Sequence, residues 1–488
     1  MMLRLVLLLA GKDYMAAATA LVSTSTPAPL IAWATSHGAR VTEAIEIKSG
    51  LFGQGLFAAA DIAAGTEMVM LPVILQLGMR QLASGSNQGL QSLCQALPEQ
   101  SASSAPCGIS LCAEMALGPE SLFAPYIAEL PTLLTGSIAP SASGFGSSSA
   151  STYDDAPDLT SWPSTGSKVS AKRRAIRELH ANSAPSSLSL SDLCWASAIV
   201  ESRAFRISNV PQLSAAEARK VGSRAATDQT RLLPVIDLAN HAGALSNAAV
   251  GNIRRTAHRM EGSAPLTATS MISTRAIKAG EEITLDYGAG KPIANERLLL
   301  EYGFVLRPHA DDWIDLPLDS LVAFASLAIT DAQADRVAQG IEAMTADEED
   351  DLSALKEAML AISDGTAAAG VFQYGANGVP SLQALALALA LTCRDASELA
   401  ALRGEDRLRI SLEDLVARCA ESRSHFDRAL ALLRVTAANA LDEAPPARQE
   451  EGSCSSFAEL ARAYYETRRD ILTLAAVHGA AVVLDEVP

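Results

Sequence analysis

A continuous apolar run from Leu232 to Ile236 stands near the middle of the chain. Three polar residues, Asp237, Asn240 and His241, follow it at close spacing. Short apolar runs of this kind are typical of buried segments. We therefore expect polar side chains to emerge where a buried segment ends, which is how a binding or catalytic site is presented.

Strict alternation of apolar and polar residues appears farther along, in the sequence ITLDY. Its apolar members are Ile283, Leu285 and Tyr287, and the turn sequence KAGEE precedes it at residues 278–282. A period of two residues is the pattern of a β-strand. The segment therefore predicts a strand with Tyr287 at its exit.

Near the N-terminal end, the sequence SGLFGQGLFAAADIAAGTEMVMLP predicts two strands around a turn at Ala64 and Gly65. Gly53, Gln54 and Gly55 in the same sequence predict a tight turn. Because glycine has no side chain, such a turn lets the backbone approach a ligand closely. A single Gly-x-Gly is more often an ordinary turn, so both interpretations are open at this point.

Residues from about 76 to 190 are predicted to be mainly helical, with one interruption. Between about 136 and 170 the chain is rich in Ser, Gly, Ala and Pro. Such a composition buries too little apolar surface to offset the entropy of ordering, so we predict a disordered loop there. A further helix is predicted over residues 191–205, with a serine N-cap.

After residue 304 the apolar residues recur every three to four positions, as in SLQALALALALTC and FAELARAYYETRRDILTLAAVHG. This period is that of amphipathic helices. Residues 319–488 are therefore predicted to form an all-helical second domain.

Composition bounds these expectations. The chain has 488 residues, of which 49% are hydrophobic and 19% charged, so we expect a globular protein of two or three domains. The formal net charge of −17 disfavours binding to nucleic acid, which requires attraction to phosphates. The seven cysteines are scattered and include no Cys-x-x-Cys pair, which favours reduced thiols over disulfides or a zinc site.

Residues 1–28 form a leader with an apolar run from Leu5 to Ala10. The run is too short to span a bilayer, which takes about 20 apolar residues, so no stable membrane insertion is expected. The Ala, Ser and Thr content that follows is mildly like an organelle transit peptide. A targeting segment and an ordinary leader both fit, and the location is open between a plastid or other organelle and the cytoplasm or nucleus.

Taken together, four motifs resemble the SET domain of protein methyltransferases. They are the Asp-x-x-Asn-His step at 237–241, the Ala-Gly-Glu-Glu turn, the strand ending in Tyr287 and Gly288, and the Tyr-Gly-Phe step at 302–304. The sequence is most similar to the subgroup typified by the Rubisco large-subunit lysine methyltransferase. LFAPYIAELP at 122–131 resembles part of the insert of that subgroup, although its apolar residues are also explained by core packing.

The resemblance implies an α+β fold. A β-rich SET domain with a knot-like core and a helical insert is expected over residues 29–310, followed by an all-α substrate-binding domain at 319–488. It also implies a monomeric protein-lysine N-methyltransferase that uses S-adenosylmethionine, needs no metal, and acts on a non-histone protein with an accessible lysine.

The resemblance assigns roles residue by residue, with Tyr287 as the catalytic residue. Substrate contacts carry over to Arg203, Asp237 and Tyr302. Cofactor contacts carry over to Gly53, Gln54, Gly55, Arg203, Asn240, His241 and Tyr287.

Each substrate residue also has a structural explanation. Arg203 could cap the last carbonyls of its helix, Asp237 could fix a local turn, and Tyr302 could pack in a core. Departures from the subgroup stand at Phe52, where an acid is usual, and at Arg297, where a Glu is common.

Two alternative functions stay open. Histidine methylation occurs in relatives of the same subgroup, but those lack the tyrosine that stands here as Tyr302. A catalytically inactive SET scaffold that binds a protein partner is the second alternative, and the joint presence of Asn240, His241 and Tyr287 speaks against it.

Overall fold

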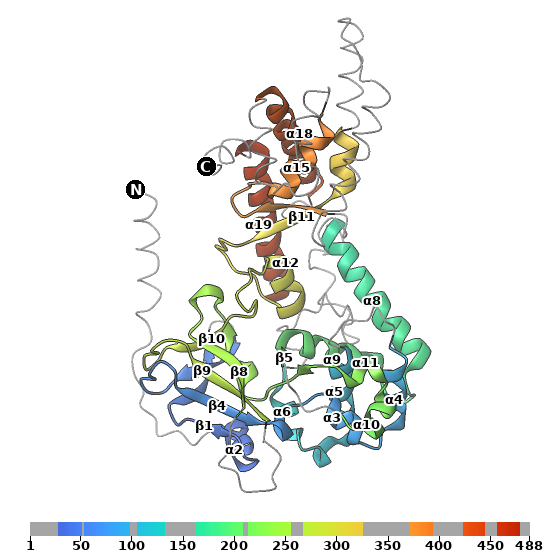
Figure 1. Cartoon of the computed structure of the whole chain (residues 1–488), viewed down its shortest axis with the longest axis vertical. Helices are drawn as coiled ribbons and strands as arrows, with labels where there is room; N and C mark the ends of the chain where they lie inside the picture. The colour runs from blue at the N-terminus through green and yellow to red at the C-terminus, as the bar shows by residue number, and fades with distance from the viewer. Residues whose placement is uncertain are drawn as a thin grey trace, which may run out of the picture. The chain divides into compact units, whose positions relative to one another are not determined.

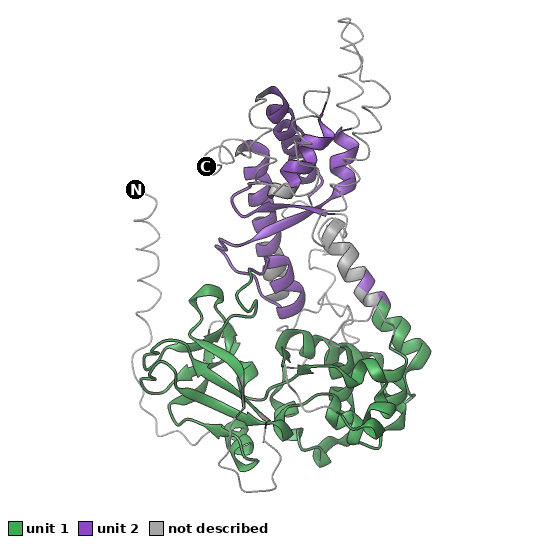
Figure 2. Cartoon of the chain, in the orientation of Figure 1, with its two compact units in different colours: residues 1–138, 175–291 green, residues 139–174, 292–488 purple. Residues whose placement is uncertain are grey.

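The structure, a computed structural model, describes residues 28–50, 53–97, 105–131, 163–207, 213–254, 267–325, 371–393, 423–444 and 456–478. It divides into two compact units, residues 1–138 with 175–291 and residues 139–174 with 292–488 (Figure 2). Residues 1–27 of the predicted leader lie outside the described residues. Most of the predicted loop at 136–170 does too, although its last residues fall in helix α8, Pro163–Ser183.

The first unit contains two four-stranded sheets (Figure 1). One is wholly antiparallel, with the order β1 (Arg40–Val41), β4 (Glu67–Pro72), β9 (Thr267–Ser273) and β8 (Ala248–Arg254). The other has the order β2 (Ile45–Gly50), β3 (Gly53–Ala58), β10 (Glu282–Leu285) and β7 (Asn240–His241). In this second sheet β7 runs parallel to β10, while the remaining pairs are antiparallel.

The rest of the first unit is mainly helical, as the sequence predicts. Helix α5 is the most buried of these helices and packs against α9, which begins at the serine N-cap Ser189. A short antiparallel pair, β5 (Phe205–Arg206) and β6 (Thr230–Arg231), follows α9. The helices are α2 (Pro29–Ser36), α3 (Met79–Ser84), α4 (Gln88–Gln95), α5 (Ala105–Leu117), α6 (Ala124–Glu129), the part of α8 from residue 175 onward, α9 (Leu190–Arg203), α10 (Ala215–Val221) and α11 (Ser223–Ala226).

The hydrophobic pattern explains the position of the central strand β10. Ile283 and Leu285 are 0% and 3% exposed, whereas Glu282 and Thr284 are half-buried. Side chains of a strand alternate between its two faces, so one face of β10 enters the core and the other carries polar groups. Tyr287 follows the strand, as the sequence predicts.

The second unit is largely helical but contains a strand pair. It comprises α12 (Asn295–Arg297), η8 (Leu298–Tyr302), β11 (Trp313–Pro317), β12 (Val371–Gly375), α15 (Leu382–Leu391), α18 (Arg423–Asp442) and α19 (Ser456–His478). Residues 319–488 are predicted to be all-helical, but the strand β12 lies within them. Its sequence VFQYG alternates with Phe372 and Tyr374 buried, and it pairs antiparallel with β11.

Buried Arg468 holds the last helix of the second unit in place. Its side chain is 1% exposed, donates to the Tyr464 hydroxyl at 2.8 Å and to the Asp315 carbonyl at 3.3 Å, and lies 3.7 Å from the Glu296 carboxylate. These partners lie on α19, β11 and α12. A buried guanidinium is costly unless it is paired and hydrogen-bonded, so this set of contacts specifies how the three elements pack.

A second buried polar contact adds to this specification. The Asn295 side chain donates to the Asp312 carboxylate at 2.7 Å, and the Asn295 backbone N–H donates to the same group at 2.8 Å. The helices around these contacts bury many alanines and leucines. Such side chains pack well but specify little about how helices are arranged, so the buried polar contacts provide that information.

Five cysteines lie in the described residues, and all five are free and buried: Cys94, Cys107, Cys112, Cys194 and Cys393. Burial raises the pKa of the Cys107 thiol to about 12, which keeps it protonated. Cys419 and Cys454 lie outside the described residues. Of the helices in the described ranges, none combines the length and apolar character that crossing a membrane requires.

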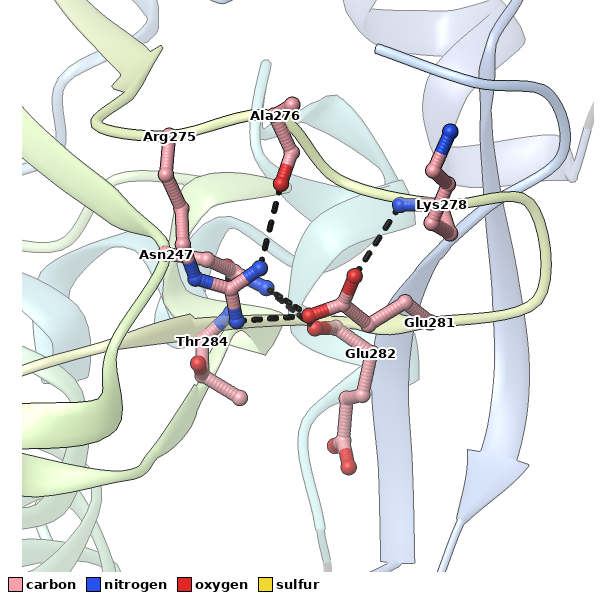
Figure 3. Close-up of polar contacts among 7 residues, drawn as sticks. All are labelled: Asn247, Arg275, Ala276, Lys278, Glu281, Glu282 and Thr284. Carbon is pink, nitrogen blue, oxygen red and sulfur yellow. Dashed lines mark hydrogen bonds and ion pairs between the residues drawn. The ribbon is translucent and has the colours of Figure 1, made fainter. Parts of the chain in front are cut away.

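Asn247 joins β10 to the loop before β8. Its amide nitrogen donates to the Glu282 carbonyl at 2.8 Å, and its amide oxygen accepts from the Thr284 backbone N–H at 2.8 Å. The residue is 1% exposed, so these hydrogen bonds are shielded from water. Figure 3 shows the Asn247 side chain beside β10, next to the Glu281 carboxylate that Arg275 contacts.

We expect Asn247→Ala to lower the free energy of unfolding by about 2–4 kcal/mol, because it leaves buried backbone groups of β10 without partners. Urea unfolding followed by circular dichroism would measure the change. Asn439→Ala is the matched control, since it removes one exposed hydrogen bond to Glu443 and should cost less than about 0.5 kcal/mol. Equal stability of the two variants would show that Asn247 does not hold β10.

Candidate functional site

The segment before β7 presents its polar residues from a strained backbone. Leu232, Leu233, Val235 and Ile236 are all fully buried, which confirms the predicted buried run. Val235 has φ of 73° and ψ of −51°, a conformation that a β-branched residue rarely adopts. Such strain persists only where the surrounding packing imposes it, and it occurs most often at functional sites.

Parallel pairing brings Asn240 and His241 beside the end of β10. Asn240 is opposite Thr284 and His241 is opposite Leu285 in this register. The two residues therefore lie next to the segment that leads into Tyr287, although 46 residues separate His241 from Tyr287 in the chain. The structure thus joins two motifs that the sequence presents far apart.

His241 and Tyr287 form a contacting pair. The Tyr287 backbone N–H donates to His241 Nδ1 at 3.2 Å, and the two ring centroids are 5.0 Å apart. The Tyr287 hydroxyl donates to the Ala239 carbonyl at 3.0 Å. Both ends of the tyrosine are therefore held by the residues around β7, which fixes its hydroxyl oxygen in one place.

Asp286 shapes the turn that follows β10. Its carboxylate accepts from the backbone N–H groups of Gly288 and Gly290 at 2.9 and 2.6 Å. Ala289 between them has φ of 51°, which places it in the left-handed region. The aspartate therefore sets the direction in which the chain leaves Tyr287.

Asp237 is the centre of a buried polar network. Its side chain is fully buried, and its Oδ2 accepts from the Tyr126 hydroxyl at 2.6 Å. Arg203 donates from Nη1 to the Asp237 carbonyl at 3.1 Å, and the same nitrogen lies 3.7 Å from Oδ2. Arg203 thus contacts the predicted site segment, whereas the capping explanation would have it bond to its own helix.

Burial controls the protonation of this network. It raises the pKa of Asp237, against the opposing effects of the Arg203 charge and the Tyr126 hydrogen bond. Burial, followed by the nearby Asp237 carboxylate, also raises the pKa of Tyr126 well above its ordinary value. Oδ1 of Asp237 is buried and accepts no hydrogen bond within the described part of the chain.

Gly55 of β3 lies against side chains from β7 and β10. A Cβ atom added to Gly55 would lie 2.8 Å from Glu282 Oε1 and 2.9 Å from Asn240 Nδ2, so only glycine lets these two side chains pack against β3. The Asn240 amide donates to Glu282 Oε1 at 2.7 Å. Three strands therefore place a glycine, an amide and a carboxylate around one point.

The Gly-Gln-Gly sequence differs in one respect from its prediction as a turn. Gly53, Gln54 and Gly55 are the first residues of strand β3, and Gly53 pairs with Gly50 on β2. Gly53 has φ of 95°, which favours glycine, while Gln54 is exposed. Phe52 lies outside the described residues.

Tyr302 belongs to the second unit, so the structure does not relate it to the residues above. It ends the short helix η8, and its ring centroid is 6.4 Å from that of Phe304. Burial raises the pKa of its hydroxyl. Arg297, a departure from the subgroup pattern, forms an ion pair with Glu301 one helical turn on.

Sequence reasoning misses three residues that the structure places at the site. Tyr126 is predicted as core, and it is 1% exposed, but its hydroxyl reaches Asp237. Glu282 is predicted only as part of a turn. The alternating pattern of ITLDY marks Asp286 as polar but does not indicate that it shapes the turn after Tyr287. The polar position of Glu282 in the alternating strand is a signal that could find it, because that face also carries Asn240.

Among the described residues there is no cluster of His, Cys, Asp or Glu that could hold a metal ion. Asn240 and Glu282 offer polar groups of another kind, an amide and a carboxylate that are hydrogen-bonded to each other. Carboxylate and amide oxygens are acceptors that suit a cationic donor such as an ammonium.

Comparison with known proteins agrees with this architecture. Residues 53–288 match the family model of the SET domain, so the chain carries a SET domain. Comparison with curated protein sequences gave no match.

Two solved structures show the likeness of the fold. The SET domain of LSMT bound to lysine and AdoHcy is 15% identical, with a TM-score of 0.57, over 93% of this chain and 91% of that one. Rubisco LSMT bound to AdoMet is 14% identical, with a TM-score of 0.55, over 93% and 92%. The α+β fold class that the sequence predicts is thereby confirmed, and the fold is similar to that of the Rubisco LSMT structures.

The buried position of Asp237 predicts a specific pH dependence. Because burial raises its folded-state pKa above the ordinary value of 3.8, its contribution to stability is full below that pH and is lost as pH rises through the raised value. Asp237→Asn removes this titration. We expect the variant to gain stability relative to the wild type as pH rises above 3.8 towards the raised pKa.

Urea unfolding at several pH values would measure this difference. Asp61→Asn is a control of opposite sign, because hydrogen bonds from Lys278 and Ala279 lower the pKa of Asp61. It should lose stability relative to the wild type as pH rises through the lowered pKa to the ordinary value of 3.8, and then stay level. Parallel curves for Asp237→Asn and the wild type would show that Asp237 titrates normally.

Proposed function

We propose that the chain is a protein methyltransferase that uses S-adenosylmethionine and modifies lysine. The observation that carries the proposal is the parallel pairing that brings Asn240 and His241 beside Tyr287 within the SET domain. The resemblance of the motifs and the lysine and AdoHcy bound in a structure of the same fold support the acceptor and the cofactor.

The residues of the first unit fit the cofactor. When bound, S-adenosylmethionine supplies a methyl carbon attached to a positively charged sulfur. Gly55 lets the Asn240 side chain pack directly against β3, and Gly53 and Gln54 precede it in the same strand. We assign Asn240 and His241 to hold that end, with Arg203 beside it.

Tyr287 is proposed as the catalytic residue. Its hydroxyl donates to the Ala239 carbonyl at 3.0 Å, so its oxygen has a fixed position and needs no rearrangement during transfer. An oriented hydroxyl and a carbonyl oxygen can accept weak C–H···O contacts from a methyl group as positive charge develops. Alignment of the reacting atoms provides the larger part of the rate increase.

A lysine acceptor must lose its proton before it can react, because its ordinary pKa is about 10.4. Removal from water lowers that pKa, and water can carry the proton away, so no dedicated base is required. We assign Arg203 and Asp237 to the substrate side, where Tyr126 holds the carboxylate. Tyr302 is assigned to the acceptor channel on the resemblance of its Tyr-Gly-Phe step.

Tyr287→Phe tests this assignment. We expect methyl transfer to fall at least about 100-fold, as for loss of a donor at other reacting centres, while affinity for S-adenosylmethionine stays within about threefold. Transfer would be measured with isotopically labelled cofactor on a cell lysate, and the labelled residues mapped by mass spectrometry. Affinity would be measured by calorimetry.

Tyr374→Phe is the matched control, since it removes a buried tyrosine hydroxyl bonded to the Leu433 carbonyl of the second unit. It should lower stability and leave transfer in place. Unchanged turnover in Tyr287→Phe would overturn the role of Tyr287. Label on histidine would replace lysine as the acceptor, and cofactor binding to no form of the protein would favour a binding scaffold.

Asn240→Ala should instead weaken cofactor binding, because it removes the amide that we assign to the cofactor's amino-acid end. We expect the Kd for S-adenosylmethionine to rise about tenfold, the cost of one lost hydrogen bond to a charged group. Asn377→Ala, which removes an exposed contact with the Val379 backbone in the second unit, is the control. An unchanged Kd in Asn240→Ala would place the cofactor elsewhere.

A further inference from the structure

Tyr126 connects the helical insert to the candidate site through its hydroxyl group. Its side chain is 1% exposed, and the hydroxyl donates to Asp237 Oδ2 at 2.6 Å. The two residues are 111 positions apart in the chain, and Tyr126 lies on α6 whereas Asp237 lies just before β7. A buried hydrogen bond therefore joins the insert to the segment that carries the site residues.

Helix α6 is held at both of its ends. The Trp33 ring of α2 lies edge-on to that of Phe123, with ring centroids 6.3 Å apart. Beyond the other end of α6, the Trp195 indole N–H of α9 donates to the Pro131 carbonyl at 3.0 Å. Because both ends of this short helix are fixed, the Tyr126 hydroxyl has a defined position.

Asp237 is held by two elements of the first unit. It lies in the short 3₁₀ helix η6, Ile236–Leu238, directly after the strained residue Val235. Tyr126 of α6 bonds to its carboxylate, and Arg203 of α9 donates to its carbonyl at 3.1 Å. A strained turn keeps its conformation only where its surroundings impose it, and these two contacts provide that constraint.

The same turn carries the carbonyl group that fixes Tyr287. Ala239 directly follows η6, and its backbone N–H donates to the Ile236 carbonyl at 3.2 Å. The Ala239 carbonyl accepts from the Tyr287 hydroxyl at 3.0 Å. A displacement of Asp237 would therefore shift, two residues farther on, the acceptor that sets the position of the Tyr287 oxygen.

Core packing accounts for the ring of Tyr126 but not for its hydroxyl. Phenylalanine would fill nearly the same volume without a polar group that needs a partner when buried. Asp237 Oδ1 accepts no hydrogen bond within the described residues, and Arg203 Nη1 is 3.7 Å from Oδ2, beyond hydrogen-bond distance. The Tyr126 hydroxyl is thus the main determinant of how this carboxylate is oriented.

We propose that Tyr126 is a positioning residue for methyl transfer. Through Asp237 it fixes the turn that carries Ala239, and thereby the hydroxyl of Tyr287. This assignment rests on the proposed function, because it takes Tyr287 as the catalytic residue. It gives the helical insert a part in the reaction, whereas the sequence predicts only core packing for Tyr126.

Tyr126→Phe tests the contact itself, since it keeps the ring and removes only the hydroxyl. Hydrogen exchange followed by mass spectrometry would measure how firmly the turn is held in the protein alone. We expect the backbone amides of residues 237–239 to exchange about tenfold faster in the variant, because a hydrogen bond to a carboxylate is lost. The amides of β11 in the second unit should stay within about twofold of the wild type.

A double-mutant cycle tests whether Tyr126 acts through Tyr287. With isotopically labelled S-adenosylmethionine and a cell lysate, Tyr126→Phe should lower the initial rate of transfer about tenfold, because the reacting groups are misaligned. Calorimetry should give a Kd for S-adenosylmethionine within about twofold of the wild type. In a Tyr287→Phe background the same substitution should change the remaining rate by less than about twofold, because the hydroxyl that it positions is gone.

Tyr374→Phe is the matched control, because it removes a buried tyrosine hydroxyl that bonds to a backbone carbonyl of the second unit. It should lower the midpoint of thermal unfolding and leave both the exchange at residues 237–239 and the rate of transfer within about twofold of the wild type. Thermal unfolding would also confirm that each variant is folded.

Three results would overturn the assignment. Exchange at residues 237–239 that stays at the wild-type rate in Tyr126→Phe would show that the hydroxyl does not hold the turn. An equal loss of transfer in the wild-type and Tyr287→Phe backgrounds would show that Tyr126 does not act through Tyr287. Absence of transfer by the wild type, with exchange altered as expected, would overturn the proposed function and the positioning role with it.

Discussion

The parallel pairing of β7 with β10 is the constraint on which the candidate site depends. β7 has only two residues, Asn240 and His241, and short strands have little stability of their own. The Asn247 side chain forms hydrogen bonds with the backbone of β10, and the Tyr287 hydroxyl donates to the Ala239 carbonyl. Side-chain hydrogen bonds thus stabilise the pairing of β7 with β10, which would be weak if it depended on the two-residue strand alone.

The first unit contains two groups of polar residues near the β7–β10 pair, one buried and one half-buried. The Asp237 network with Tyr126 and Arg203 is buried, and its partners come from the helical insert and from α9. The hydrogen bond between Asn240 and Glu282 lies on the half-buried face of the sheet. Burial therefore raises the pKa of Asp237 in the first group.

Local patterns by themselves determined much of this protein. The alternation of β10, the buried run before Asp237, the N-terminal serine of α9 and the helical periods after residue 304 depend on nearby residues, so they could be predicted from the chain. The clustered motifs likewise indicated the SET fold. The strand β12 was missed because its partner β11 lies far back in the chain, and short apolar segments do not reveal distant pairing.

Only the tertiary structure decided which polar groups meet. The contacts of Tyr126 with Asp237, of Asn240 with Glu282 and of Tyr287 with Ala239 join residues 111, 42 and 48 positions apart. Sequence shows that such residues are polar or aromatic, but their separation in the chain carries no information on distance in space. Strand register and burial supply that information, because they bring the residues of separate motifs into contact at one site.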